Sequence, residues 1–256
     1  MSDQLTLLGV GASAGTPVVG CECNTCQSTN KKNYRTRCSS LLTLKNGKNI
    51  LIDTSPDLRL QSLREGLTSV DAVLYTHHHA DHCHGIDDLR AFCQINKKQI
   101  PLYGNQFSID ELNKKFQYAM TEPNGFWEVP ILKPNVINDP IELFGQNIRP
   151  IPVFHGKALI NGYRLGNVAY LTDVSKIPDS SMEQLQNLDV LFLDCLRNEP
   201  HPTHLSVKES IEIALELKVK KTFLIHMTHD LEYDALSKIL PESIYVGYDG
   251  LKINVN

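Results

Sequence analysis

Several features that would place the chain in a special class are missing from its sequence. No apolar run approaches the roughly 18 residues that a transmembrane helix needs. Residues 1–15 lack the basic region and long apolar stretch of a signal peptide. The net charge of -4 gives no basic excess for nonspecific binding to nucleic acid or membrane. We therefore expect a cytoplasmic protein with no membrane partner and no stable nucleic-acid partner.

Internal repeats, low-complexity tracts and Pro/Gly-rich linkers are missing as well. The composition, with 41% hydrophobic and 21% charged residues, is that of an ordinary globular protein. A chain of 256 residues suffices for one α/β core and needs no second one. We expect one domain over residues 1–256.

Apolar runs and turn signals predict strands with interleaved helices, which favours sheets packed between helices over strict βαβ alternation. Strands are expected at residues 5–10, 40–44, 49–52, 72–75, 141–154, 162–172, 190–193 and 221–225, with a hairpin turn at 46–47, another turn at 166–167 and a closing hairpin at 244–255. Helices are expected at residues 55–65, 87–94, 181–187 and 231–239. Two more are expected to begin at predicted capping boxes, one formed by Ser108 and Glu111 and the other by Ser206 and Glu209. The helix that begins at Ser206 is expected to reach Leu217. The proline-rich residues 121–139 are expected to be irregular.

Five histidines and an aspartate lie within residues 76–85, THHHADHCHG. Histidine is neither a good core filler nor a favoured loop residue, so this density needs a chemical reason. His77 and His79 are alternate residues and point the same way from an extended segment. Asp81 and His82 follow after the chain turns. The spacing lets one loop serve two adjacent metal ions, one through His77 and His79 and the other through Asp81 and His82.

Four predicted strands end in a residue that can bind a metal, namely His77, His155, Asp173 and His226. Strand ends gathered along one edge can aim such side chains at one site. Imidazole and carboxylate together suit Zn, Mn or Fe, whereas calcium prefers oxygen ligands. The alternative interpretation is that these residues are surface histidines and a helix-capping aspartate. It does not account for both the spacing within residues 77–82 and the positions of the other candidates at strand ends.

On these residues the chain resembles the metallo-β-lactamase-fold hydrolases. The resemblance implies an α/β fold of the αββα type, two mixed sheets between outer helices, with two divalent ions (Zn or Mn) between the sheets. It also implies the ligand sets, which are His77, His79 and His155 on one ion, Asp81, His82 and His226 on the other, and Asp173 as the bridge. His78 is then expected to face the opposite way, and His84 to pack or face solvent near the following helix.

Asp53, at the end of the predicted strand 49–52, resembles the family's strand-end aspartate. In that role it would accept a hydrogen bond from a ligand histidine and fix its tautomer. An equally simple interpretation is an aspartate that begins the turn at residues 54–56. Both interpretations stay open on the sequence alone.

Three of the seven cysteines, Cys21, Cys23 and Cys26, lie within six residues. In a chain without an export signal, this crowding indicates a metal site rather than disulfides. A structural zinc needs a fourth ligand, for which His229, Cys38 and Cys83 are candidates. The alternatives are reduced cysteines in a loop, or redox sensors, although the motif has no basic residue to lower a thiol pKa.

With this cysteine loop (about residues 20–27), the chain is similar to the PhnP-type cyclic phosphodiesterases, and PqqB-like proteins share the loop. The resemblance selects His229 as the fourth zinc ligand. It implies hydrolysis of small phosphodiesters, such as phosphoribosyl cyclic phosphate or 2′,3′-cyclic nucleotides, by a hydroxide that the two ions activate. Catalytic roles fall to Asp81 and to His204, whose position matches the histidine that acts on the leaving group.

His201 competes with His204 for this role, because it lies only three residues earlier in the sequence. The alternative interpretation of His204 is structural, namely that its side chain packs against the helix that follows it. Arg35, Arg37 and Arg90 are expected to be solvated surface residues rather than phosphate ligands.

Three other functions share parts of this pattern. A thioesterase or lactamase of the same fold would use the same seven metal ligands without the cysteine loop. A transfer-RNA 3′-processing nuclease would carry a long basic arm, which the sequence lacks. A PqqB-like biosynthetic or carrier protein would be non-catalytic. We expect a small-molecule phosphodiester as the substrate, and the protein could also form a homodimer.

Overall fold

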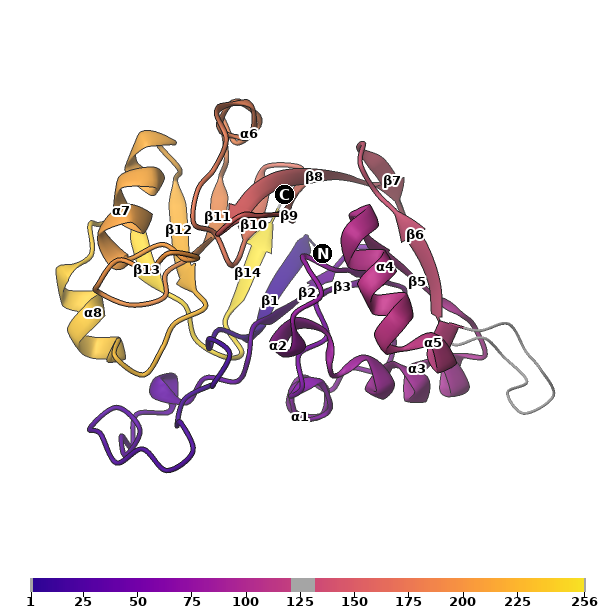
Figure 1. Ribbon diagram of the computed structural model, residues 1–256, viewed down its shortest axis with the longest axis horizontal. Helices are drawn as coiled ribbons and strands as arrows, with labels where there is room; N and C mark the ends of the chain where they lie inside the picture. Colours follow the sequence, from indigo (N-terminus) through magenta and orange to yellow (C-terminus); the bar gives the residue numbers. More distant parts are fainter. Residues whose placement is uncertain (1, 121–131, 256) are drawn as a thin grey trace.

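Two seven-stranded sheets pack face to face, with helices on their outer sides (Figure 1). The structure is a computed structural model and describes residues 2–120 and 132–255. Each sheet is mixed, with antiparallel pairs in one half and parallel pairs in the other. The predicted α/β arrangement of two mixed sheets between outer helices is confirmed.

The first sheet comes from the N-terminal half of the chain plus the last strand. In spatial order its strands are β14 (Lys252–Val255), β1 (Asp3–Gly9), β2 (Ser39–Thr43), β3 (Asn49–Ile52), β4 (Ala72–Leu74), β5 (Ile100–Gly104) and β6 (Leu132–Val136). The predicted hairpin of β2 and β3 is confirmed, with Leu41 opposite Leu51. From β3 onward the pairs are parallel, so these strand ends meet at one edge of the sheet.

The second sheet comes from the C-terminal half. In spatial order its strands are β13 (Ile244–Val246), β12 (Lys221–Ile225), β11 (Val190–Asp194), β10 (Val168–Leu171), β9 (Ala158–Leu165), β8 (Gln146–His155) and β7 (Ile141–Leu143). Strands β10 to β13 are parallel to one another, and their ends also share an edge.

The helices cover the two outer faces of the sandwich (Figure 1). On the first sheet lie α1 (Leu58–Glu65), α2 (Ala80–Cys83), α3 (Leu89–Asn96), α4 (Gln106–Lys115) and α5 (Gln117–Met120). On the second sheet lie α6 (Asp179–Gln184) and α7 (Val207–Glu216). Helix α8 (Tyr233–Ile239) packs against β13, and its Leu236 belongs to the cluster that lies between the sheets. The capping box of Ser206 and Glu209 at the start of α7 is confirmed.

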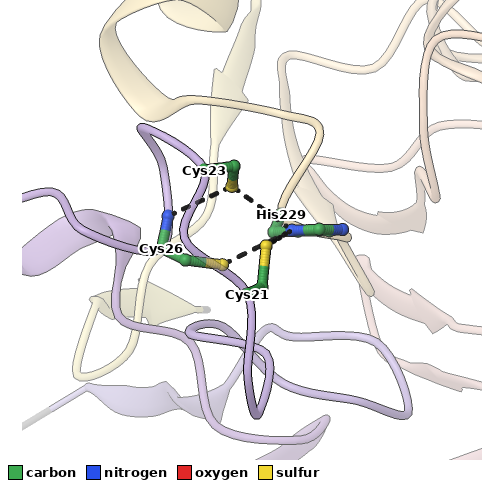
Figure 2. Close-up of side chains that lie close together, drawn as sticks. All are labelled: Cys21, Cys23, Cys26 and His229. Carbon is green, nitrogen blue, oxygen red and sulfur yellow. Dashed lines mark hydrogen bonds between the residues drawn. The ribbon is translucent and has the colours of Figure 1, made fainter.

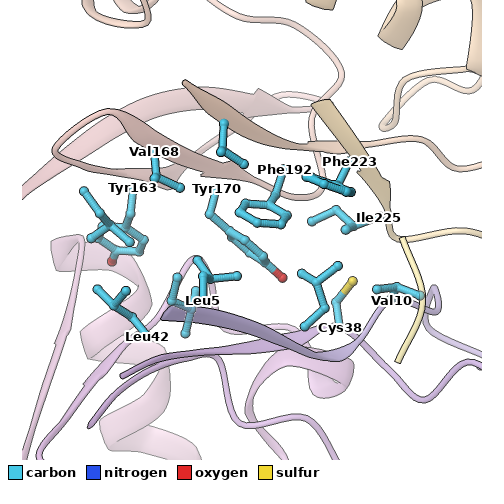
Figure 3. Close-up of a cluster of buried hydrophobic side chains, with 14 of the residues drawn as sticks. Leu5, Val10, Cys38, Leu42, Tyr163, Val168, Tyr170, Phe192, Phe223 and Ile225 are labelled. Carbon is cyan, nitrogen blue, oxygen red and sulfur yellow. The ribbon is translucent and has the colours of Figure 1, made fainter. Parts of the chain in front are cut away.

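The largest hydrophobic cluster lies between the sheets, where Leu5 and Leu42 of the first sheet face Tyr163 and Phe192 of the second (Figure 3). A second cluster lies between the first sheet and its helices, and a third lies between the second sheet and the helices that cover it. Both faces of the central strands are therefore buried. This explains why strands such as β11 read as continuous apolar runs rather than as alternating patterns.

Three expectations about elements were wrong. Residues 244–255 do not form a hairpin, because β13 joins β12 in one sheet and β14 joins β1 in the other. Residues 132–136 are not irregular, since they form β6 against β5; residues 121–131 lie outside the described residues. Helix α4 begins at Gln106, and its N-cap is Asn105, whose side chain accepts from the Ser108 amide, so Ser108 is not the cap.

Candidate active site

The ends of strands from both sheets converge at one place. His77 follows β4, His155 ends β8, and Asp173 and His226 follow β10 and β12. Four overlapping groups of the described residues form there, in each of which one ligand atom per residue lies within 4.8 Å of the others, and two of the four include His204. The other two hold the residues expected from the sequence. Of these two, the first group holds His77, His79 and His155, and the second holds Asp81, His82, Asp173 and His226. These are the seven residues expected from the sequence, divided as expected; their role as ligands stays a prediction.

Helix α2 explains how one short loop reaches both groups. His79 is its N-cap residue, and the amide of His82 donates to the His79 carbonyl at 3.0 Å. This turn carries Asp81 and His82 round to the second group. The ring of His78 packs against Phe107, and the ring of His84 packs against Phe116. Neither of these two histidines belongs to a metal-competent group of the described residues.

Three residues that follow strands at the site adopt left-handed backbone conformations. Asp53, Asp173 and His226 each have a φ of 59°. Side chains other than glycine rarely occupy this region, and residues held there cluster at functional sites. Here the conformation ends the strand at once and turns a polar side chain into the space between the sheets.

Hydrogen bonds fix the tautomers of three histidines. His82 Nδ1 donates to Asp53 Oδ2 at 2.8 Å, and His155 Nδ1 donates to the Thr203 carbonyl at 2.9 Å. Because a carbonyl accepts only, the proton of His155 lies on Nδ1. His77 Nδ1 lies 3.0 Å from the Thr76 hydroxyl, which itself donates to Asp53. Each Nε2 is thereby left with a free lone pair, as a metal ligand requires.

Several buried nitrogens at the site have no hydrogen-bond partner. They are Nε2 of His77, Nε2 of His82 and both ring nitrogens of His226. Buried polar atoms in proteins are normally paired, so each such atom calls for an explanation. Divalent ions between the three Nε2 atoms and the carboxylates of Asp81 and Asp173 would account for those three atoms, since Asp173 Oδ2 lies 3.1 Å from His82 Nε2 and 3.4 Å from His226 Nε2. His226 Nδ1 instead faces Asp194, 3.5 Å away. The nitrogen and oxygen donors fit Zn, Mn or Fe.

The pKa shifts of the two carboxylates, Asp173 and Asp81, agree with a metal site. Burial alone would raise the pKa of Asp173, but His226, His82 and His77 hold it well below its usual value. Burial would likewise raise the pKa of Asp81, yet His82 and His226 lower it. Burial lowers the pKa of His77 well below its usual value, and His82 adds to the effect. Burial would lower the pKa of His82 and of His226, but Asp173 raises both, so these two imidazoles hold a proton in the absence of an ion. The carboxylates are in the ionised form that binds metals, and the two imidazoles would release a proton on binding an ion.

His204 lies inside this site, whereas His201 lies at its margin. The His204 side chain is buried, with its ring 4.8 Å from the rings of both His155 and His226. Its Nε2 atom is 3.9 Å from Asp173 Oδ1. His201 is only partly buried, and its Nδ1 atom lies 3.1 Å from the hydroxyl of Thr203. Of the two candidates, the structure therefore brings His204 to the metal-competent residues.

Asp194 is a central residue of the site that the sequence analysis missed. This fully buried carboxylate ends β11 and accepts from the Asp173 amide at 2.9 Å and from the Leu205 amide at 2.9 Å. It also lies 3.3 Å from His204 Nδ1 and 3.5 Å from His226 Nδ1. The signal was present, because residues 190–194 form a fifth apolar strand that ends in a polar residue.

The hydroxyl of Ser13 was missed as well. It donates to Asp81 Oδ2 at 2.7 Å and so orients a carboxylate of the second group. Ser13 lies in the loop after β1, far from Asp81 in the sequence, and no local pattern could have shown the contact. Asp53, by contrast, lies where one of its two interpretations put it, against a histidine of the predicted ligand set.

A second cluster lies near this site (Figure 2). His229 Nδ1 is 3.3, 3.4 and 3.4 Å from the sulfur atoms of Cys21, Cys23 and Cys26. A tetrahedral zinc with bonds of about 2.0–2.3 Å would place nitrogen and sulfur about 3.5 Å apart. The structure thus brings together the three cysteines and the histidine that the resemblance selected. The hydrogen bond from the Cys26 amide lowers the pKa of Cys23 to about 6, although the motif has no basic residue.

The other candidates for the fourth position lie elsewhere. Cys38 is buried in the core between the sheets, and the thiol of Cys83 donates to the His78 carbonyl.

Arg35 is not a surface residue as expected, because it is 1% exposed and donates to the carbonyls of Thr228 and Leu231. It therefore holds the loop that carries His229.

No helix in residues 2–120 and 132–255 is long and apolar enough to cross a membrane.

Comparisons with known proteins give a family and several relatives. The family described as beta-lactamase superfamily domain matches residues 48–227. A crystal structure of a diphosphatase from the PhnP family is 43% identical, with a TM-score of 0.93, and the match covers 99% of this chain and 98% of that one. Zinc-bound PqqB from Methylobacterium extorquens is 18% identical with a TM-score of 0.77, covering 98% and 100%, and shows the fold alone.

A curated relative, the octanoyltransferase of Porphyromonas gingivalis, is 37% identical over 251 residues. The match covers 96% of this chain and 50% of the relative, so the chain spans about half the length of that protein.

Proposed function

Because the chain belongs to the beta-lactamase superfamily and to its PhnP-type branch, we propose that this metallo-β-lactamase-fold hydrolase cleaves small phosphodiesters, cyclic phosphates among them. Two divalent ions, Zn or Mn, would be held by the two groups of the site, with Asp173 able to reach both. Cys21, Cys23, Cys26 and His229 would hold a structural zinc.

The observation that carries the proposal is the position of His204. Its buried ring stands between His155 and His226, and Asp194 contacts its Nδ1 atom. A histidine held by a carboxylate beside a metal site can give a proton to a departing oxygen. An alcohol leaving a phosphodiester needs such a proton.

Divalent ions bound at the site would supply Lewis-acid activation of water at neutral pH and neutralise the charge of the phosphate. The protein's own residues do the rest. Ser13 and Asp53 orient Asp81 and His82, and Asp194 orients His204 with Nε2 toward Asp173. As the oxygen of water bonds to phosphorus, the bond from phosphorus to the alcohol oxygen breaks. That oxygen takes the proton from His204 Nε2. The proton that the attacking water loses passes to solvent, and His204 regains its proton from solvent before the next turnover.

A second candidate is the hydrolysis of a diphosphate. It is favoured by the name of the 43% identical structure, a diphosphatase. The name octanoyltransferase belongs to a relative of which this chain spans about half, and it makes a thioester a necessary member of any substrate panel. Both readings use the same metal-competent residues, so substrates must separate them.

A pair of esters that differ in the need for a proton tests the proposal. The metal-loaded protein is assayed on the methyl ester and the p-nitrophenyl ester of thymidine 5′-phosphate. We expect His204→Ala to lower kcat/KM for the methyl ester by about 100-fold or more. The loss on the p-nitrophenyl ester should be far smaller, because p-nitrophenolate departs without a proton.

His84→Ala is the matched control, since the His84 ring packs against Phe116 outside the metal-competent groups, and it should affect both esters little. An equal loss on both esters in His204→Ala would show that His204 is not the proton donor. Turnover of thymidine 5′-diphosphate without turnover of either ester would replace the proposal by the second candidate. Turnover of a thioester alone would move the protein to acyl chemistry.

A further inference from the structure

A cavity of about 360 Å³ opens directly beside His204. Its lining comes from residues 12–15 and Val18 in the loop after β1, from residues 228–230 after β12, and from Leu196, His201 and His204. This volume lies within the range of about 300–1,000 Å³ that is usual for small-ligand pockets. Since His204 belongs both to the cavity and to the metal-competent cluster, the cavity continues the active site on the side of the proposed proton donor.

The lining of this cavity has an unusual charge for a phosphate-processing enzyme. It contains no lysine or arginine among the described residues, and Asp230 is its one carboxylate. The Asp230 side chain is 57% exposed, and its Oδ2 atom accepts from the Thr228 hydroxyl at 3.1 Å. Ala12, Ala14, Val18 and Leu196 make much of the remaining wall apolar.

Two arginines come close to the cavity but are engaged elsewhere. Arg37 passes near Gly15, and its Nε atom pairs with Asp57 Oδ2 at 3.0 Å. Arg197 is close enough to His201 to influence its pKa, but its guanidinium donates to the carbonyls of Glu199 and Pro200. Neither guanidinium lines the cavity.

Resting on the proposed phosphodiester hydrolysis, we propose that this cavity is the leaving-group subsite and that it takes an uncharged, hydroxyl-bearing alcohol. The departing oxygen must lie at His204, so the rest of the departing group extends into the space that His204 lines. A carboxylate there accepts hydrogen bonds from hydroxyl groups, as acidic residues do from ribose in nucleotide-binding sites. The leaving group of a diphosphate is itself a phosphate, which Asp230 repels and which no lysine or arginine of the lining neutralises. The proton on His204 is present for either leaving group, so it does not favour the phosphate over the alcohol. The cavity thus selects diesters over diphosphates.

Two substrates that release the same product test the subsite. The glyceryl ester of thymidine 5′-phosphate and thymidine 5′-diphosphate both yield thymidine 5′-phosphate, one by loss of glycerol and the other by loss of phosphate. We expect the wild type to favour the glyceryl ester in kcat/KM. Asp230→Lys should shift the ratio of the two kcat/KM values toward the diphosphate by about tenfold or more, and Asp230→Asn by less.

Glu212→Lys is the matched control, because it makes the same change of charge on α7 at a side chain that is 61% exposed and lies outside the cavity. It should leave the ratio unchanged. Zinc bound per chain is measured in every variant, since Asp230 adjoins His229. Asp230→Asn keeps the shape of the side chain, so an effect of charge can be read even if the lysine variant folds poorly.

The outcomes separate the two proposals. If both substrates are cleaved and neither Asp230 variant moves the ratio, the subsite assignment is wrong and the phosphodiesterase proposal stands. A wild type that prefers the diphosphate also overturns the subsite. If the metal-loaded wild type cleaves no diester at all, the proposed function itself has failed. A shift in Asp230→Lys with none in Glu212→Lys supports the inference.

Discussion

Single residues outside the predicted ligand set position the side chains of this site. Asp53, Ser13 and the carbonyl of Thr203 each contact one side chain of that set, and Asp194 faces the rings of His204 and His226. Such outer partners orient a ligand and select its tautomer, and their loss typically weakens metal binding about 10–100-fold. Individual substitutions at these positions should therefore act on metal affinity before they act on the fold.

Asp53→Asn tests this at the residue scale. The substitution removes the charge that faces His82 Nδ1, so His82 is no longer held by an ionised acceptor. We expect the affinity of the site for its active-site ions to fall about 10–100-fold. The check is the metal content per chain after dialysis against a weak chelator.

The predicted zinc site of Cys21, Cys23, Cys26 and His229 serves as the internal control, because Asp53 contacts none of these residues. One ion per chain should remain in Asp53→Asn while the others are lost. Full retention of all ions would show that Asp53 only begins a turn, as its other interpretation holds.

Residue types and spacing revealed the seven metal-competent residues, because His77, His79, Asp81 and His82 are close in sequence and the others end apolar strands. Asp194 ends a strand too, but its role depends on His204 and His226 from two other segments. Contacts of that kind arise only when the two sheets meet. The candidate metal ligands can therefore be predicted from a single sequence, whereas the residues that orient them cannot.

At the scale of elements, the start of α4 shows why a local pattern can mislead. Ser108 and Glu111 have the spacing of a capping box, yet the helix begins earlier and Asn105 caps it. The Asn105 side chain accepts from the Ser108 amide at 2.8 Å and donates to the Leu159 carbonyl at 3.0 Å. The second contact joins α4 to β9 of the other sheet, which no local pattern contains.

Asn105→Ala and Ser108→Ala form a matched pair for this finding. Loss of an N-cap costs about 1 kcal/mol, whereas an alanine inside a helix is favourable. We expect Asn105→Ala to lower the free energy of unfolding by about 1 kcal/mol or more and Ser108→Ala by clearly less. Urea unfolding of the two variants and the wild type measures this difference. The reverse order would restore Ser108 as the cap.

At the scale of the whole molecule, the chain crosses from one sheet to the other between β13 and β14. The sequence predicted one closing hairpin over residues 244–255. In the structure β13 pairs with β12 and β14 pairs with β1. Gly247 allows the crossing, since a Cβ atom there would lie 2.6 Å from the Leu224 carbonyl oxygen. Which sheet a short strand joins is decided by long-range packing.

Asp249 anchors this crossing to the first sheet. Its Oδ1 atom accepts from the Val10 amide at 3.1 Å, and its Oδ2 atom accepts from the Thr36 amide at 2.9 Å and pairs with Arg64 at 3.2 Å. Burial raises the pKa of Asp249 from its usual value of 3.8 to about 6, against the effect of these donors. The folded protein therefore holds a proton on Asp249 more tightly than the unfolded chain does.

The free energy of unfolding should therefore depend on pH, and the contribution of Asp249 should decrease as the pH rises. Stability from a raised pKa is fully present below about pH 4 and is lost as the pH rises through about 6, by about 3 kcal/mol in all. Asp249→Asn cannot titrate, so the difference in unfolding free energy between wild type and variant should fall toward neutral pH. Urea unfolding of both proteins from pH 4.5 to 7.5 measures it. A difference that stays constant, or that grows with pH, would mean that the donors from Val10, Thr36 and Arg64 outweigh burial and keep Asp249 ionised throughout.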